Sequence, residues 1–210
     1  MALRSQFDHL VVAIRSLTEG ISEFERLTGI RASAGGIHPG RGTENALVSL
    51  GEAEYLEIIA PQPGAVLSPH DERMRTLDRL QIISWAIAVS DVGEAVAAIE
   101  RAGFAASPPR PGSRVTPSGE RLEWSTFDLA DSSVALAPFF IHWSPSTKHP
   151  STTAPAGCAL VQLTLQDPKS DRLSVALAAL GVKDVSYARG APRIEATLRC
   201  GSKTAILATP

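Results

Sequence analysis

The sequence predicts an α+β protein of repeated βαβββ modules, two paired around a cleft and a third following at the C-terminal end. One observation behind this prediction is an order of strand, helix and three strands that recurs three times, each time over roughly 50 to 75 residues. The other is that each module has a single amphipathic helix, which can cover only one face of a small sheet. The uncovered faces of two modules can therefore form a cleft between them.

The first module covers residues 1–61. Its opening stretch, "FDHLVVAI", is typical of a strand because it alternates and is rich in β-branched residues. The amphipathic stretch that follows, "SLTEGISEFERLTGI", predicts a helix that begins after Ser16 or Thr18 and ends at Gly29. Three more strands are expected, separated by glycine-rich turns, in IRASAG, NALVSLG and AEYLEIIA.

The same order of elements returns in two later parts of the chain. Residues 82–143 form the second module and residues 157–210 form the third. The linker 62–81 is rich in proline and separates the first two modules, which together make one predicted domain over residues 1–143. The helices predicted for the second and third modules are DVGEAVAAIERAGF and PKSDRLSVALAALG.

The composition is that of an ordinary globular protein. The net charge is -2, the pI is near 6.2 and basic residues form no cluster, which argues against a nucleic-acid partner. The apolar runs fall well short of the roughly 20 residues that cross a bilayer, so no membrane partner is expected. The first residues show no signal-peptide pattern, which predicts a cytoplasmic protein. In that compartment Cys158 and Cys200 are expected to be buried, reduced thiols.

Two apolar strands each carry a side chain that can bind a metal or exchange a proton. His9 lies in the first strand and Glu57 in the last strand of the first module. A buried carboxylate is costly to leave unpaired, so Glu57 needs a metal ion, a proton or an arginine such as Arg41. Asp8 is expected on the opposite face of the strand from His9, where it would face solvent or cap a turn. His149, in the second linker, is expected to be a surface or loop-packing residue.

The repeat and several motifs resemble the glyoxalase-like branch of the vicinal oxygen chelate superfamily. The motifs are "FDHLVV", "GGIHPGRGTENALVSLG" followed by "YLEIIAP", and "PFFIHW" followed by "HPS" and "APAGC". The resemblance covers nearly the whole chain and implies a divalent metal in the cleft, held by the first and last strand of each module. The superfamily includes lyases, epimerases, dioxygenases, transferases and metal-free binding proteins, and the fold alone does not choose among them.

Carried over to this sequence, the resemblance implies a metal site made of His9, Glu57 and His142. Two imidazoles and one carboxylate suit Zn(II), Ni(II), Mn(II) or Fe(II) and leave positions open for substrate and water. Ser84 occupies the position where many relatives have a His or Gln, and it is expected in the cleft as a substrate contact. Trp143, next to His142, is expected to point to the other face and pack under the helices.

Other polar residues are expected near the mouth of the cleft. His38, Arg41 and Asn45 lie in a glycine-rich connection, which is either a tight turn or a loop that contacts the substrate. Arg110, Arg114 and Arg121 bracket the loop "VTPSGE". This loop is either solvated or folds over the cleft, where an arginine could hold an anionic substrate.

Three kinds of function follow from these residues. With a metal, the protein would be a lyase or isomerase acting on a small substrate with two neighbouring oxygens, and Glu57 could instead act as the base. The same ligand set would also suit a ring-cleaving dioxygenase. Without a metal, the cleft would bind and sequester a small apolar or aromatic molecule. The third module lacks polar site residues, which predicts packing within the chain, an interaction module or a homodimer.

Overall fold

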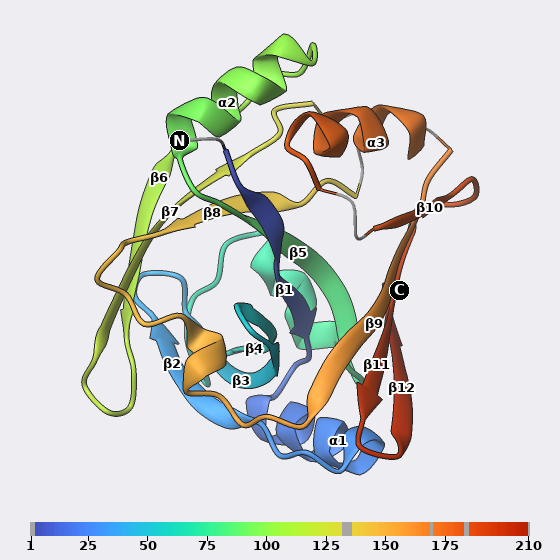
Figure 1. Cartoon of the computed structure of the whole chain (residues 1–210). Helices are drawn as coiled ribbons and strands as arrows, with labels where there is room; N and C mark the ends of the chain where they lie inside the picture. Colours follow the sequence, from blue (N-terminus) through green and yellow to red (C-terminus); the bar gives the residue numbers. More distant parts are fainter. Residues whose placement is uncertain (1–2, 132–135, 169, 183–184, 210) are drawn as a thin grey trace.

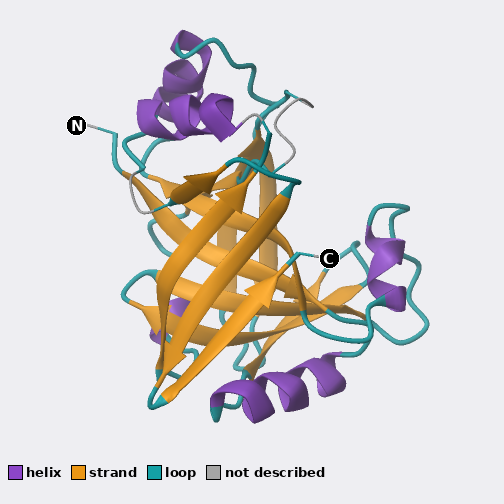
Figure 2. Cartoon of the chain, turned by 90° about the vertical axis from the view of Figure 1, so that its right-hand side faces the viewer, coloured by secondary structure: helices purple, strands orange, loops and turns teal. Residues whose placement is uncertain are grey.

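The computed structural model describes residues 3–131, 136–168, 170–182 and 185–209, and it confirms the α+β class (Figures 1 and 2). The first module consists of β1 (Ser5–Ala13), α1 (Leu17–Thr28), β2 (Ser33–His38), β3 (Thr43–Gly51) and β4 (Glu54–Pro61). The second consists of β5 (Gln81–Val89), α2 (Val92–Arg101), β6 (Arg110–Val115), β7 (Arg121–Asp128) and β8 (Phe139–Trp143). The third consists of β9 (Cys158–Gln166), α3 (Ser170–Ala179), β10 (Ser186–Ala188), β11 (Arg193–Cys200) and β12 (Lys203–Ala208). Two short 3-10 helices lie in the linkers, η1 (Asp71–Thr76) and η2 (Pro150–Thr152).

Side-chain caps explain where the first two helices begin. The N-cap of α1 is Ser16, whose hydroxyl accepts a hydrogen bond from the Glu19 amide, and Asp91 caps α2 through the Glu94 amide. Gly29 ends α1 in the left-handed conformation, with φ of 80°.

In the part of the chain that the structure describes, no helix is long and apolar enough to span a membrane.

The first two modules share one eight-stranded sheet with the strand order β2-β3-β4-β1-β5-β8-β7-β6. The modules join where β1 and β5 pair antiparallel at the centre of the sheet. Within each module the first and last strands pair parallel, β1 with β4 and β5 with β8. The first strands of both modules therefore lie side by side at the middle of the sheet, with the last strands flanking them.

The eight-stranded sheet curls until its two outer strands, β2 and β6, approach each other (Figure 1). Arg114 of β6 donates a hydrogen bond to the carbonyl oxygen of Gly35 on β2. A Cβ added at Gly36 would lie 2.6 Å from the Val115 carbonyl oxygen, and Gly36 has a positive φ of 136°. Glycine is therefore required for this close approach of backbone to backbone, and it gives the sheet an enclosed inner face.

The third module forms a separate four-stranded sheet. Its strand order, β10-β9-β11-β12, differs from that of the first two modules because β9 pairs with both β10 and β11. Buried side chains of this module, such as Leu165, Leu177 and Leu198, belong to the same core as Phe24 and Trp85 of the other two. The third module therefore packs within the chain, while the homodimer remains a prediction.

A smaller apolar cluster lies on the inner face of the curled sheet. It contains Val11 and Ala13 of β1, Ile59 of β4 and Met74 of η1. Met74 is only 1% exposed, so the linker helix η1 fills part of the interior. Apolar side chains thus lie beside the polar cluster described below.

The two cysteines form a disulfide, so the prediction of reduced thiols is wrong. Cys158 on β9 and Cys200 on β11 face each other in the antiparallel register, and their sulfur atoms are bonded. Sequence could not show this, because the residues are 42 positions apart and only the strand pairing brings them together.

Gly20 lets α1 pack closely on the sheet, which gives a testable prediction. A Cβ at Gly20 would lie 2.7 Å from Ile14 Cγ2 and 2.9 Å from Ile58 Cγ2. We expect Gly20→Ala to lower the free energy of unfolding by about 1–3 kcal/mol through overpacking, despite the better helix propensity of alanine. Urea denaturation measures this, with Gly93→Ala in α2 as the matched control, since its Cβ would meet only Asp91 Oδ1, at 3.4 Å. A Gly20→Ala variant as stable as Gly93→Ala would contradict the packing described here.

Candidate functional site

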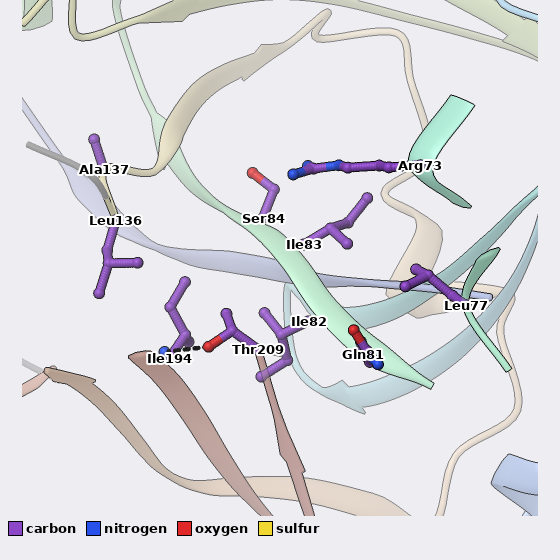
Figure 3. A pocket seen from close by; sticks show the side chains of 10 residues that line it. All are labelled: Arg73, Leu77, Gln81, Ile82, Ile83, Ser84, Leu136, Ala137, Ile194 and Thr209. Atoms are coloured by element: carbon purple, nitrogen blue, oxygen red, sulfur yellow. Dashed lines mark hydrogen bonds between the residues drawn. The ribbon is translucent and has the colours of Figure 1, made fainter. Parts of the chain in front are cut away.

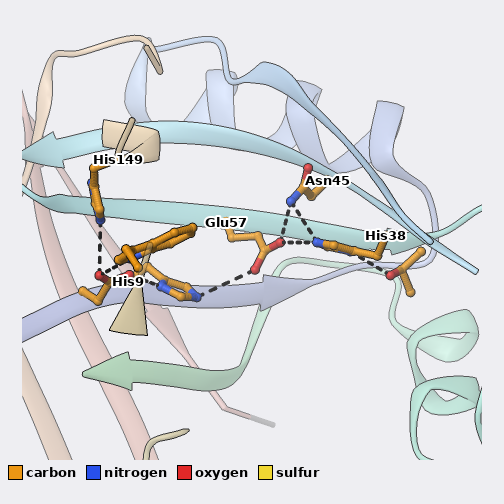
Figure 4. A network of polar contacts seen from close by, with 8 residues as sticks. His9, His38, Asn45, Glu57 and His149 are labelled. Carbon is orange, nitrogen blue, oxygen red and sulfur yellow. Dashed lines mark hydrogen bonds and ion pairs between the residues drawn. The ribbon is translucent and has the colours of Figure 1, made fainter. Parts of the chain in front are cut away.

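Glu57 lies at the centre of a polar cluster on the inner face of the curled sheet (Figure 4). Its Oε1 accepts a hydrogen bond of 2.6 Å from Asn45 Nδ2 and lies 3.4 Å from His38 Nε2. Its Oε2 lies 3.9 Å from His9 Nε2. The side chains of His9, His38 and Glu57 are 3%, 11% and 11% exposed, so the cluster is almost entirely shielded from solvent.

Strand pairing brings these residues together from four neighbouring strands. Across β3 and β4, Asn45 faces Ile59, which shares a face with Glu57 two residues earlier. His38 faces Thr43 across β2 and β3, and their side chains lie 3.0 Å apart. The predicted candidates His9, His38, Asn45 and Glu57 are thus assembled in one place.

His9 is held from its other side by Asp8. The two side chains lie 2.5 Å apart, from His9 Nδ1 to Asp8 Oδ1. Asp8 Oδ2 accepts a hydrogen bond of 2.9 Å from Trp143 Nε1 and lies 3.2 Å from His149 Nε2. A hydrogen bond at one imidazole nitrogen fixes the ring, so His9 presents Nε2 to Glu57. The ring of Tyr55 stacks on His9 at a centroid distance of 4.4 Å.

The expectation that Asp8 faces solvent or caps a turn is wrong, since Asp8 is only 1% exposed. The pairing of β1 with β5 shifts register between Phe7 and His9, and such a bulge changes where neighbouring side chains point. The face of the strand assigned to Asp8 from simple alternation was therefore wrong. His149 does pack in a loop, but its contact is with this buried carboxylate.

Burial and neighbouring imidazoles act against each other on the two carboxylates. Burial alone would raise the pKa of Asp8, but hydrogen bonds from His149 and His9 lower it to about 2. Burial likewise opposes ionisation of Glu57, yet the charges of His38 and His9 and the Asn45 hydrogen bond bring its pKa below the usual value of 4.5. Both side chains are therefore ionised at neutral pH.

The pKa of His38 is shifted in the opposite sense. Burial lowers it below the usual 6.5, and the positive charges of Arg41 and Arg114 act in the same direction. Glu57 raises it but does not outweigh the other effects. His38 is therefore mainly a neutral imidazole at pH 7, able to donate one proton and accept another.

The lowered pKa of Asp8 predicts a loss of stability in acid. The unfolded chain binds the proton near the usual pKa of 3.8 and the folded chain near 2, so this stabilisation is present above about pH 4 and lost as the pH falls through 2. We expect about 2 kcal/mol of the free energy of unfolding to disappear over this range. Chemical denaturation between pH 5 and pH 2 measures it, and Asp8→Asn should show a flatter profile. Parallel profiles for the two proteins would contradict this assignment.

The inner and outer faces of β8 are the reverse of those expected from sequence. Phe139 packs edge-on against His9, with centroids 5.3 Å apart, and Trp143 reaches Asp8, so these alternate residues point inward. His142 lies between them in the alternation and points outward, with Nδ1 3.0 Å from the Val89 carbonyl oxygen. The structure therefore does not bring His142 to His9 and Glu57.

The other predicted contacts lie apart from Glu57. Arg41 lies 3.6 Å from Asp71, and Arg121 forms an exposed ion pair with Glu123, so neither balances the charge of Glu57. Ser84 pairs with Val11, and Val11 pairs with Glu57 on its other side, so β1 separates Ser84 from Glu57. Ser84 borders a cavity of about 210 Å³ whose lining does not include Glu57 (Figure 3). That cavity is lined by Arg73, Leu77, Gln81, Ile82, Ile83, Ser84, Leu136, Ala137, Ile194 and Thr209.

The donor atoms do not fit the metal site expected from the resemblance. One of its three ligands, His142, points to the opposite face. Within the described ranges, no three His, Cys, Asp or Glu side chains are arranged to hold a metal ion. Each oxygen of Glu57 faces a different imidazole, and the hydrogen bond that holds this carboxylate comes from Asn45.

The comparisons define the family. Residues 7–181 match the family model described as "Glyoxalase-like domain". The chain therefore belongs to the glyoxalase-like domain family. No curated protein is similar enough to match the sequence.

Solved structures share this fold at low sequence identity. A hypothetical protein from Staphylococcus aureus is 13% identical with a TM-score of 0.65, covering 98% of this chain and 85% of its own. A hypothetical protein from Bacillus halodurans is 17% identical with a TM-score of 0.51, covering 69% and 98%. Methylmalonyl-CoA epimerase from Streptomyces coelicolor is 16% identical with a TM-score of 0.48, covering 71% and 100%. At these identities, the two structures with TM-scores above 0.5 show similarity of fold alone.

Proposed function

We propose that this glyoxalase-like protein is a lyase or isomerase in which Glu57 removes a proton from carbon next to a carbonyl group of a small substrate. The observation that supports this proposal is the placement of an ionised, nearly buried carboxylate between two imidazoles. A positioned base of this kind typically contributes about 10²–10⁴-fold to a proton transfer.

The surroundings of Glu57 keep it in the reactive, unprotonated form. The Asn45 amide holds Oε1 through a 2.6 Å hydrogen bond, while Oε2 is at 3.9 Å from His9 Nε2, too far for a hydrogen bond. Oε2 is therefore the oxygen that is free to accept a substrate proton. A substrate that displaces water from this enclosed face would strengthen the electrostatic interactions there.

The imidazoles suit the return of the proton. In the proposed step the C–H bond breaks, the proton forms an O–H bond on Glu57, and the electron pair moves into the carbonyl to give an enolate. The proton then returns to carbon or to the enolate oxygen, and no oxidant or reductant is needed. His38, as a neutral imidazole, can hydrogen-bond to the enolate oxygen, and His9 is kept in one orientation by Asp8.

Sequestration of a ligand without chemistry is the second candidate. The same burial that shields the cluster would suit a tight binding pocket, and apolar side chains such as Met74 and Phe139 adjoin it. A dioxygenase would need a metal on a two-histidine, one-carboxylate site, and the three residues expected to form it are not assembled.

Deuterium exchange separates catalysis from binding. The protein is incubated in deuterated water with small 2-oxo acids, hydroxyaldehydes and thiol adducts of dicarbonyls, and proton NMR follows the carbon-bound hydrogens. Protein-dependent exchange at carbon next to a carbonyl is the expected result. Ligands that stabilise the protein against heat without any exchange would support sequestration instead.

A further inference from the structure

Arg114 is a buried cation beside the proposed base. It lies on β6 at one edge of the curled sheet and is only 4% exposed. Its Nη1 donates to the Gly35 carbonyl oxygen on β2, so the guanidinium bridges the two outer strands. Gly35 in turn packs against the Asn45 side chain, because a Cβ there would lie 2.4 Å from Asn45 Oδ1. Arg114 is thereby connected through one residue to the Asn45 amide that holds Glu57.

The positive charge of Arg114 has no direct counter-ion in the part of the chain that the structure describes. Among the described residues, no carboxylate forms an ion pair with it, whereas arginines such as Arg110 and Arg121 each pair with an acid at the surface. The guanidinium of Arg114 has five N–H donors. Among the described residues, its one hydrogen-bond acceptor is the Gly35 carbonyl oxygen. Buried arginine is rarely left in this state, because desolvating an unpaired charge is costly.

The nitrogens of Arg114 that make no hydrogen bond are not completely enclosed by the protein. Within the described ranges, the fully enclosed side-chain nitrogen and oxygen atoms without a partner belong to Ser5, Asn45 and Gln81, and none belongs to Arg114. The guanidinium is also close enough to Glu57 for its charge to contribute to the lowered pKa of that carboxyl, although the two do not form an ion pair. The contact through Gly35 and Asn45 and the reach of this charge place Arg114 in the same part of the inner face as Glu57.

We propose that Arg114 binds the carboxylate of the substrate, so that the substrate of the proposed reaction is a small 2-oxo acid. This inference rests on the proposed function for the reaction but makes its own claim about binding. The planar guanidinium matches a carboxylate through two parallel hydrogen bonds. Its charge offsets the repulsion between the substrate carboxylate and Glu57, and the carbon next to the 2-oxo group would then face the base.

The test compares pyruvate with pyruvamide, which has nearly the same shape but no charge. Binding is measured by thermal stabilisation of the protein, and reaction by deuterium exchange of the methyl hydrogens. Arg114→Gln removes the charge, Arg114→Lys keeps the charge without the planar pair of donors, and Arg110→Gln removes a surface charge from the same strand. Circular dichroism confirms that each variant is folded.

We expect the parent and Arg110→Gln to bind and exchange pyruvate in preference to pyruvamide. Arg114→Gln should weaken pyruvate binding roughly 10- to 100-fold, through KM rather than kcat, and leave pyruvamide unchanged. Arg114→Lys should fall between the two. Equal treatment of pyruvate and pyruvamide by the parent, or unchanged pyruvate affinity in Arg114→Gln, would overturn the inference.

The two proposals fail in different ways. If exchange depends on Glu57 but is equally fast for pyruvate and pyruvamide, the proposed function stands and the role of Arg114 is overturned. Arg114-dependent stabilisation by pyruvate with no exchange of any compound would do the reverse. No stabilisation by pyruvate at millimolar concentration would overturn the inference whatever the exchange assay shows.

Discussion

Replacing Glu57 with glutamine is expected to slow proton exchange at the substrate carbon by about 10²–10⁴-fold, because the amide cannot accept the proton. The change is nearly isosteric and keeps an oxygen for the 2.6 Å hydrogen bond from Asn45. The variant should therefore fold and still bind the substrate. Initial rates of deuterium incorporation, measured with the parent and the variant side by side, give the ratio.

Glu44→Gln is the matched control for this prediction. Glu44 is on β3, next to Asn45 in sequence, and its side chain points to the opposite face. It should exchange at the rate of the parent. A Glu57→Gln variant that keeps most of the parental rate would show that another group is the base, and His9 would be the next candidate because Asp8 orients it.

Removal of the disulfide is expected to produce the largest change in stability. A bond between residues 42 positions apart restricts the unfolded chain, which corresponds to about 4 kcal/mol in the loop-entropy model. The double variant Cys158→Ala, Cys200→Ala should therefore unfold at a lower urea concentration than the oxidised parent. The bond lies within the third module, so the effect reports on how that module contributes to the shared core.

A reducing agent supplies the control for the disulfide. Reduction of the parent should shift its urea midpoint towards that of the double variant, whose own midpoint should not respond. Thiol titration confirms that the reductant has broken the bond. If the urea midpoint of the parent is nevertheless unchanged, the prediction is contradicted.

Sequence was sufficient for those features that depend on local pattern. The strand character of β1 and the amphipathic character of α1 are properties of short stretches, and the structure confirms them. It also confirms the end of α1 at Gly29 and selects Ser16, one of the two expected caps, as its start. The same holds for the recurring order of elements. His9 and Glu57 were recognisable because an ionisable side chain on an apolar strand is costly unless it has a partner.

Features that depend on pairing between distant segments were not visible in the sequence. The bulge that turns Asp8 inward arises from the register of β1 against β5. The inward face of β8 is decided by packing, since the strand is short and apolar on both sides of His142. The separate sheet of the third module follows from its strand order, which the recurrence of elements does not specify.

The burial of Arg114 depends on pairing of the same kind. In the sequence Arg114 is one of several arginines around a loop, and the same role was considered for each of them. Only the curl of the sheet, which brings β6 to β2, buries this arginine and leaves Arg110 and Arg121 at the surface. The sequence alone does not distinguish Arg114 from its neighbours, because the glycine-rich strand β2 that it contacts is 79 residues away in the chain.

The proposed chemistry depends on an ionised Glu57, which carbon-13 NMR of protein labelled at the glutamate carboxyl carbons observes directly. The Glu57 resonance is assigned by its absence in Glu57→Gln and is followed as the pH is lowered. We expect a carboxylate signal at pH 7 and a titration midpoint below 4.5, the usual glutamate value. A midpoint above that value, or a protonated signal at pH 7, would contradict the role of Glu57 as base, because burial would then outweigh the histidines.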